Sequence, residues 1–334
     1  MMNLEKTLET KIPLKLGADG SFRMLMIADI QEQTTIDSRT VPALAAMLDR
    51  AKPDLVILGG DNVDGRYVKT EAELRTYFAA ILPVLEERGI AWAHIYGNHD
   101  YDAAVTPAEQ MAIYGSYPHC ITKTTPGIPG VTNYLLPVLG EDGEPVFLIW
   151  AFDTQHYLLD QIPVLDRPGD PKHKNPYYKL SNNPIPQGKF ASPGFEQQMW
   201  YWQTSCALEE KYGRKIPGMM VMHVAPWEFS MAKENPEETG LVGFTEERLL
   251  LSSLNTGIFA TALQRGDIGW MAAGHTHADD FTAAYCGMNF ALVGCGGYTP
   301  KGNDACRGGR LFTWKNGELT TEMIRYQDNP AKIS

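Results

Sequence analysis

Short apolar runs that each end in a potential metal ligand are the feature that most limits how this chain can fold. In chain order these runs end in Asp29, in Asp61, in Asn98-His99-Asp100, in His223, and in His275 with His277. In open α/β sheets, binding sites form in the crevice outside the carboxyl ends of the strands. One acid or histidine at such an end is more often a turn or core residue. Five such ends together predict a site where the strands converge.

Helical patterns between the first apolar runs predict βαβ units. Residues 38–53 and 70–89 have the apolar spacing of amphipathic helices, and the second begins with Thr70 and Glu73 in capping-box spacing. Strands that alternate with helices indicate an α/β protein with a largely parallel sheet. Further strands are expected within 146–153, 218–224, 268–275 and 288–297, and a hairpin around Asn316-Gly317.

Composition excludes several classes of function. A length of 334 residues can form one large core, so we expect a single domain over residues 1–334. A net charge of −11 argues against a nucleic-acid polymer as partner. No apolar run has the length of a membrane span, so no membrane partner is expected. Five scattered cysteines favour a reducing compartment, and we expect a cytoplasmic protein.

The segment at about 160–194 differs from the rest of the chain. It contains seven of the 22 prolines and shows little periodicity. One interpretation is a surface insertion. The other is a loop over the active site that determines the choice of substrate.

The ligand types at the strand ends predict two metal ions. Three imidazoles, two carboxylates and one amide, without a thiolate, suit Mn²⁺, Fe or Zn²⁺ better than a closed structural zinc site. They are too many for one open catalytic ion and suffice for two ions that share a carboxylate. Two ions about 3.5–4 Å apart can bind both the attacking and the leaving oxygen of a phosphoryl group.

The order of these blocks resembles the calcineurin-like metallophosphoesterase superfamily. The blocks that carry the resemblance read "ADIQ" (28–31), "GGDNVDG" (59–65), "GNHD" (97–100), "MHVAPWEF" (222–229) and "GHTHADDF" (274–281). The last two blocks are similar to the purple-acid-phosphatase-like branch, since Pro226, Glu228, Asp280 and Phe281 fit its pattern. The resemblance implies a four-layer α/β/β/α sandwich, a dinuclear centre of Mn, Fe, Zn or Mg ions, and hydrolysis of a small phosphorylated substrate by a hydroxide activated at the metals.

The resemblance also implies individual roles. A first ion would bind Asp29, Asp61 and His277, and a second ion would bind Asn98, His223 and His275, with Asp61 bridging the two. His99 would protonate the leaving oxygen or donate a hydrogen bond to a phosphoryl oxygen. Asp100 would orient the imidazole of His99.

One position departs from the family pattern, because Gln31 stands where the family has a histidine. Three interpretations remain open. Gln31 binds the first ion through its amide oxygen, which resembles a variation in enzymes that act on nucleoside diphosphate compounds. Asp64 binds in its place. Or the first site is weak and the protein partly inactive. An amide oxygen in place of an imidazole shifts the preference toward Mn²⁺ or Mg²⁺.

Three further residues are candidates for substrate contacts. Tyr101 would wall the pocket, His156 would touch substrate, and Arg66 would bind a phosphate oxygen. The sequence thus predicts a metal-dependent phosphoric ester hydrolase. The first alternative, which Gln31 favours, is a phosphodiesterase or nucleotide pyrophosphatase instead of a monoesterase. The second is a non-catalytic scaffold that has kept the fold.

Overall fold

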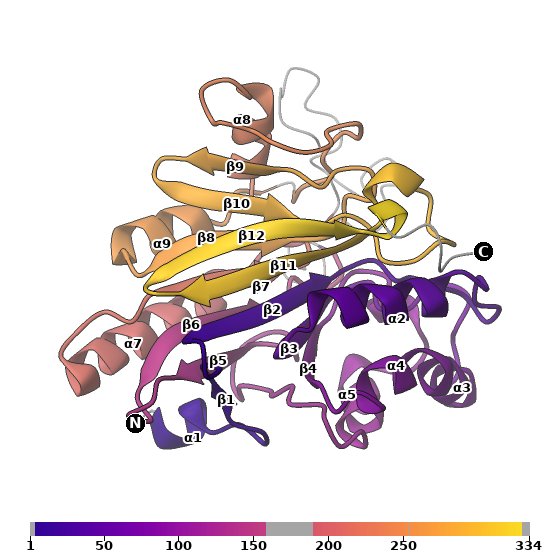
Figure 1. Ribbon diagram of the computed structural model, residues 1–334, viewed down its shortest axis with the longest axis horizontal. Helices are drawn as coiled ribbons and strands as arrows, with labels where there is room; N and C mark the ends of the chain where they lie inside the picture. Colours follow the sequence, from indigo (N-terminus) through magenta and orange to yellow (C-terminus); the bar gives the residue numbers. More distant parts are fainter. Residues whose placement is uncertain (1–3, 158–189, 253, 329–334) are drawn as a thin grey trace, which may run out of the picture.

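Two β-sheets face each other, and helices cover both outer faces (Figure 1). A computed structural model describes residues 4–157, 190–252 and 254–328. The strand order is β12-β11-β2-β3-β4 in one sheet and β1-β5-β6-β7-β8-β10-β9 in the other. This arrangement confirms the expected four-layer α/β/β/α sandwich.

The five-stranded sheet contains β2 (Ser21–Ile27), β3 (Leu55–Gly59), β4 (Ala91–Ile95), β11 (Gly308–Lys315) and β12 (Glu318–Arg325). β2, β3 and β4 are parallel, as the βαβ pattern predicts. β11 pairs antiparallel with both β2 and β12. The predicted hairpin is confirmed, and both of its turn residues have positive φ, 52° at Asn316 and 85° at Gly317.

The seven-stranded sheet contains β1 (Leu14–Lys15), β5 (Tyr134–Leu139), β6 (Pro145–Phe152), β7 (Gly218–Met222), β8 (Ile268–Ala273), β9 (Thr282–Tyr285) and β10 (Met288–Leu292). Its central strands β6, β7, β8 and β10 are parallel. β5 runs antiparallel to β6 and parallel to the short edge strand β1, and β9 runs antiparallel to β10. The prediction of a largely parallel sheet therefore holds for β2, β3 and β4 and for β6, β7, β8 and β10, whereas β11, β12, β5 and β9 add antiparallel pairs.

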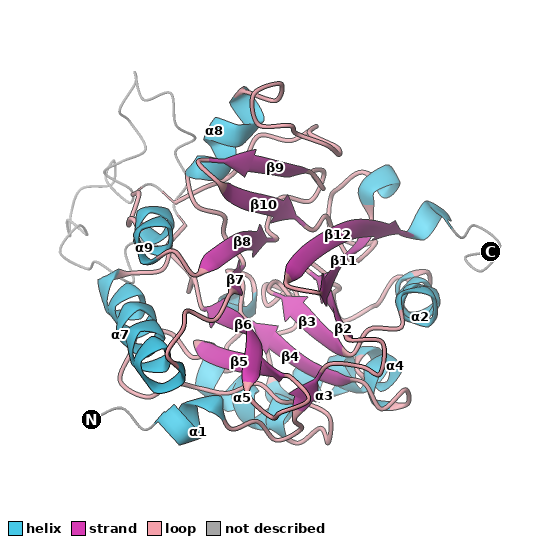
Figure 2. Cartoon of the chain, turned by 60° about the vertical axis from the view of Figure 1, so that its left-hand side comes forward, coloured by secondary structure: helices cyan, strands magenta, loops and turns pink. Residues whose placement is uncertain are grey.

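Helices form the two outer layers (Figure 2). The five-stranded sheet packs against α2 (Thr40–Ala51), α3 (Glu71–Ile81), α4 (Pro83–Glu86) and α5 (Pro107–Gly115). The seven-stranded sheet packs against α7 (Phe195–Tyr212), α8 (Glu228–Glu234) and α9 (Ile258–Arg265), with α1 (Leu4–Leu8) beside β5. The predicted capping box begins α3, since Thr70 and Glu73 each bind the backbone N–H of the other.

Short 3₁₀ helices follow some of the strands, and one of them contributes to the site described below. They are η1 (Asp100–Asp102), η3 (Asp304–Cys306) and η4 (Tyr326–Asp328).

The inter-sheet core fixes where the strands end. Met26 and Ile57 from one sheet belong to the same buried cluster as Ile149, Val221 and Ala272 from the other. Strands that are buried on both faces read as continuous apolar runs, which explains the pattern in the sequence. Because shifting a strand by one residue would turn its inward side chains outward, this core holds the register of each strand.

The proline-rich segment at about 160–194 lies largely outside the described residues. Tyr157 and Phe190, which flank the part that is not described, form an antiparallel bridge. None of the helices described in the structure is both long and apolar enough to cross a membrane.

Candidate metal centre

The ends of five strands meet at one edge of the sandwich. The candidate ligands come from the five-stranded sheet through Asp29 (after β2), Asp61 (after β3) and Asn98 (after β4), and from the seven-stranded sheet through His223 (after β7) and His275 with His277 (after β8). The side chains of Asp61 and His223 lie 3.2 Å apart although they belong to different sheets. The predicted convergence is therefore present, and the centre lies between the two sheets.

Two glycines allow the loops to approach this closely. A Cβ atom on Gly97 would lie 2.3 Å from Asp61 Oδ1. A Cβ atom on Gly60, whose φ is +90°, would lie 2.5 Å from His223 Nδ1. Side chains at either position would displace a candidate ligand.

Four of the candidate ligands have a left-handed backbone conformation. The φ angles are 55° at Asp29, 39° at Gln31, 48° at Asp61 and 68° at His275. Residues other than glycine rarely adopt this region, and such strain concentrates at functional sites. Backbone hydrogen bonds hold the strained loops, since Asp29 N donates to Gly60 O at 2.9 Å and Gln31 N to Asp61 O at 3.0 Å.

In the carboxylates of Asp29 and Asp61, one oxygen accepts a hydrogen bond from the backbone and the other faces the centre. Asp29 Oδ2 accepts from the backbone N–H of His275 at 2.9 Å, and Asp61 Oδ1 accepts from that of His99 at 2.7 Å. Asp29 Oδ1 and Asp61 Oδ2 are buried and accept no well-aligned hydrogen bond within the described residues, and each lies 3.2 Å from an imidazole Nε2, that of His277 and that of His223. These are the oxygens that two ions could bind.

Two imidazoles are oriented by backbone carbonyls. His223 Nδ1 lies 2.9 Å from Gly59 O, and His277 Nδ1 lies 2.7 Å from Lys301 O. Because a carbonyl only accepts, each Nδ1 carries the proton, and the other nitrogen is the one that can bind a metal. His277 Nε2 lies 3.2 Å from Asp29 Oδ1.

The donor set fits two ions. Six candidate ligands have buried atoms with no partner within the described residues: Asp29 Oδ1, Gln31 Oε1, Asp61 Oδ2, Asn98 Oδ1, His223 Nε2 and both ring nitrogens of His275. An unpaired buried polar group costs about 1–3 kcal/mol, so such a concentration needs an explanation. Potential ligand atoms lie within 4.8 Å of one another in two groups, Asp61-His223-His275 and Asp29-Asp61-His277. The groups share Asp61, as a bridging carboxylate would require.

Protons balance the charge of the metal-free centre. Burial alone would lower the pKa of His223, but the carboxylates of Asp61 and Asp29 raise this pKa to about 10. Burial also opposes the charge on His277, yet Asp29 raises its pKa to about 9. Burial together with the neighbouring charge on His223 depresses the pKa of His275. Metal ions must therefore displace protons from His223 and His277.

The geometry favours Gln31 over Asp64 as the remaining ligand of the first ion. The amide of Gln31 is 3% exposed and its Oε1 has no partner. Both oxygens of Asp64 instead bind the guanidinium of Arg66, each at 2.8 Å. Arg66, a candidate for a phosphate contact, is thus held by a carboxylate.

The prediction that Asp100 orients His99 is wrong. His99 Nδ1 lies 2.6 Å from Asp102 Oδ2. Asp102 lies three residues after His99, at the end of the 3₁₀ helix η1, and residues three apart share one side of such a helix. That spacing is the signal that could have identified Asp102 in the sequence.

Asp100 has a structural role. It is fully buried and accepts hydrogen bonds from the backbone N–H groups of Gly97 at 2.8 Å, Asn62 at 3.1 Å and Val63 at 3.3 Å. It therefore ties the loop after β4 to the loop after β3, and so helps to place Asn98 beside Asp61.

Tyr101 and His156 lie beside His99 but contact the protein. His156 Nε2 is 3.1 Å from Asp102 Oδ1, so one carboxylate lies between two imidazoles. The ring of Tyr101 stacks on that of His156, and its hydroxyl donates to Asp153 at 3.0 Å. These contacts place both residues next to the site without testing their predicted contact with substrate.

The chain belongs to the calcineurin-like phosphoesterase family, whose sequence pattern matches residues 22–279. Among its relatives is a "Probable inactive purple acid phosphatase 14" of Arabidopsis thaliana, 28% identical over 316 residues, covering 85% of this chain and 73% of that protein. A second Arabidopsis protein, "Probable inactive purple acid phosphatase 29", is 25% identical over 85% of this chain and 74% of its own length.

Solved structures support the fold. A dimetal phosphatase from Danio rerio superimposes with a TM-score of 0.57 at 13% identity, covering 91% of this chain and 99% of that one. GAP50, an anchor in the inner membrane complex of Plasmodium, superimposes with a TM-score of 0.50 at 9% identity, covering 90% of this chain and 84% of that one. At these identities the likeness concerns the fold alone.

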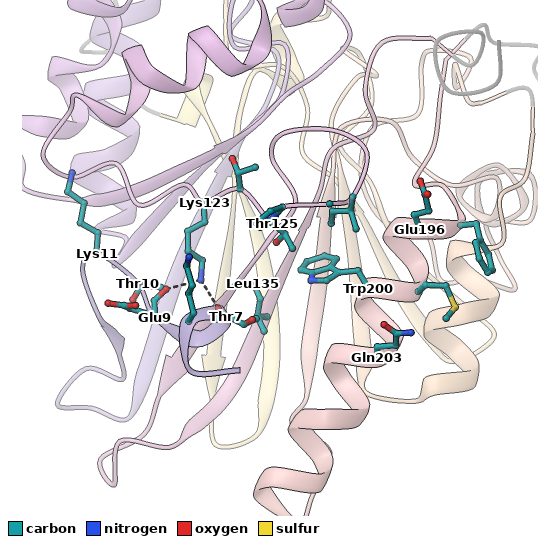
Figure 3. Close-up of a pocket in the computed structure, with 17 residues that line it drawn as sticks. Thr7, Glu9, Thr10, Lys11, Lys123, Thr125, Leu135, Glu196, Trp200 and Gln203 are labelled. Atoms are coloured by element: carbon teal, nitrogen blue, oxygen red, sulfur yellow. Dashed lines mark hydrogen bonds between the residues drawn. The ribbon is translucent and has the colours of Figure 1, made fainter. Parts of the chain in front are cut away.

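A cavity of about 840 Å³ lies away from this centre, between α1, the loop 123–128 and α7 (Figure 3). None of the candidate ligands lines it. Lys123 projects into it and donates to the carbonyls of Thr7 at 2.7 Å and Glu9 at 2.9 Å, which caps the end of α1.

Replacing Asp100 and Asp102 of η1 one at a time by asparagine should distinguish their roles. Asp102→Asn should keep both metal ions and slow the hydrolysis of an alkyl phosphate ester by about 10²-fold, with a much smaller effect on an activated aryl ester. Asp100→Asn should instead lower the free energy of unfolding by about 1–3 kcal/mol, because buried backbone donors lose a carboxylate acceptor. Turnover, bound metal and thermal unfolding of both variants measure this. Equal losses on both esters in Asp102→Asn would contradict the view that Asp102 orients His99 for proton transfer to the leaving oxygen.

Metal affinity should fall as the pH falls. Between pH 6 and 8 the metal-free protein keeps protons on His223 and His277, whose pKa values are about 10 and about 9. Each ion displaces one proton, so its apparent affinity should rise about tenfold per pH unit. Competition with a chelator at constant ionic strength measures this slope. A flat profile would contradict the assignment of either histidine as a ligand.

Proposed function

We propose that this protein is a metal-dependent phosphoric ester hydrolase with two ions at the ends of its strands. The first ion would be held by Asp29, Gln31, Asp61 and His277, and the second by Asp61, Asn98, His223 and His275. The observation that carries the proposal is the concentration of buried, unpartnered ligand atoms around one shared carboxylate. Two such ions supply Lewis acidity, which activates water and neutralises phosphoryl charge.

The two halves of the centre favour different metals. Three oxygen ligands and one imidazole would hold the first ion, a set that suits Mn²⁺ or Mg²⁺. Two imidazoles and two oxygen ligands would hold the second ion, a set that suits Fe or Zn²⁺. His223 is fully buried, whereas the His277 side chain is 18% exposed. We therefore expect the first ion to exchange with metal ions in solution more readily than the second.

His99 is placed to handle a proton at the leaving oxygen. Its Nδ1 lies 2.6 Å from Asp102 Oδ2, which fixes the orientation of the ring. Nε2 is then the ring nitrogen that would exchange a proton with the leaving oxygen of the ester. Asp102 would thus act on the substrate only through His99.

A small phosphodiester or pyrophosphate is the substrate class that the site supports best. A monoester carries a second negative charge, which calls for additional cations. Arg66, the cation nearest to the motifs in the sequence, is bound by Asp64. This contact supports the phosphodiesterase or nucleotide pyrophosphatase alternative over a monoesterase.

A non-catalytic scaffold is the rival function. The relatives named "Probable inactive" and the amide at Gln31 favour it. The presence of His99, of its partner Asp102 and of the shared Asp61 favours catalysis.

A cytoplasmic location stays part of the proposal, and the five free cysteines support a reducing compartment.

A turnover panel tests the proposed activity. The protein, reconstituted with Mn²⁺, should hydrolyse an aryl phosphodiester or a nucleoside pyrophosphate faster than an aryl phosphomonoester. A chelator should abolish turnover, and Asp61→Asn should reduce it more than about 100-fold because both ions lose a ligand. The matched control is Asp267→Asn, a buried acid that binds Tyr201 and Ser205 and lies at the opposite end of β8 from His275. Two bound ions without turnover of any ester would support the scaffold instead.

A further inference from the structure

We propose that Glu32 is a positioning residue for the first metal ion. Its carboxylate links the loop that carries Gln31 to the loop that orients His277. The inference rests on the metal centre of the proposed function and does not depend on which ester is hydrolysed.

Glu32 is a fully buried carboxylate with donors from two segments, residues 37–40 and residues 298–299. Oε1 accepts from the backbone N–H of Tyr298 at 2.9 Å and of Thr299 at 3.2 Å, and from Thr40 Oγ1 at 2.5 Å. Oε2 accepts from the backbone N–H of Asp37 at 2.9 Å and from the hydroxyl of Thr299. Burying a charge is costly unless it is well hydrogen-bonded, and this one is.

The segment that Glu32 binds reaches the first ion through a backbone carbonyl. Two residues after Thr299, Lys301 O accepts from His277 Nδ1 at 2.7 Å. Arg307 fixes the intervening backbone, since its Nη2 donates to Pro300 O at 2.9 Å. A shift of residues 298–301 would therefore turn the imidazole of His277 away from Asp29.

Both linked ligands belong to the first ion alone. Gln31 follows a strand of one sheet and His277 a strand of the other, so the centre needs a fixed distance between them. Gln31 would bind the first ion through a neutral amide oxygen, which is a weak ligand. The affinity for this ion would therefore depend strongly on the position of the Gln31 side chain. By contrast, His223 is oriented by Gly59 O, outside this segment. A defect at Glu32 should consequently weaken the first ion and spare the second.

Both side-chain oxygens of Glu32 accept hydrogen bonds, so an amide in its place would leave donors without an acceptor. Glu32→Gln keeps the shape of the side chain, but its amide nitrogen cannot accept from the backbone of Asp37 or the hydroxyl of Thr299. The buried donors left unpaired would displace residues 298–301. Thr299→Val removes one donor and leaves the carboxylate intact, so it should act in the same direction more weakly.

Metal titration of the full chain tests this role without reference to turnover. Equilibrium dialysis at graded free Mn²⁺ gives the number of ions bound and the affinity of each binding step. His277→Ala and His223→Ala identify the steps that belong to the first and the second ion. Glu32→Gln should weaken the binding step assigned to the first ion about 10–100-fold, as loss of a group that orients a metal ligand does. The affinity of the step assigned to the second ion should change by less than about threefold. Excess Mn²⁺ should restore two ions per chain.

Asp267→Asn controls for the general effect of neutralising a buried acid and should leave both steps unchanged. Wild-type binding of both ions in Glu32→Gln would overturn the proposal, and so would an equal loss at both steps. If Glu32→Gln does not fold, Thr299→Val decides by the same criteria. Selective loss of the first ion in a protein that hydrolyses no ester would refute the proposed hydrolase activity and leave the role of Glu32 intact.

Discussion

The buried carboxylate of Asp61 is the constraint on which the rest of the centre depends. One of its oxygens accepts from the backbone of His99, and the other faces His223 across the gap between the sheets. Its own backbone carbonyl binds the N–H of Gln31. Burial alone would raise the pKa of Asp61, but the positive charge of His223 lowers it well below its usual range. The carboxylate is therefore ionised and requires positive charge beside it.

That requirement connects the fold to the chemistry. The inter-sheet core sets the register of the strands, and the register sets which residue follows each strand. Left-handed conformations at Asp29, Asp61 and His275 then turn these residues toward one another at the cost of backbone strain. Without metals, protons on His223 and His277 supply the missing charge. Two divalent ions would replace them and would also satisfy the amide oxygens of Gln31 and Asn98, which protons cannot do.

Much of this could be predicted from the sequence because a buried strand has a strong pattern and a defined end. The positions of Asp29, Asp61, His223 and His275 follow from their place after apolar runs. The antiparallel pairing of β5 with β6 was not predicted, because an apolar run does not by itself define the direction in which its strand pairs with a neighbour.

Contacts between distant segments were the least predictable part. Asp102 was missed because Asp100 lies next to His99, and only the 3₁₀ turn shows that the later acid is the partner. Glu32 was missed because its partners Tyr298 and Thr299 follow it by more than 260 residues. In both cases the sequence offers the residue type, and only the fold supplies the neighbour.

The central claim is that two ions share Asp61 between the two sheets. Anomalous diffraction from crystals grown with Mn²⁺ measures this most directly, because it locates each ion independently of any activity. The account predicts two peaks about 3.5–4 Å apart on either side of the Asp61 carboxylate, one near His277 and one near His223. A single peak, or two peaks of which one lies away from Asp61, would contradict it.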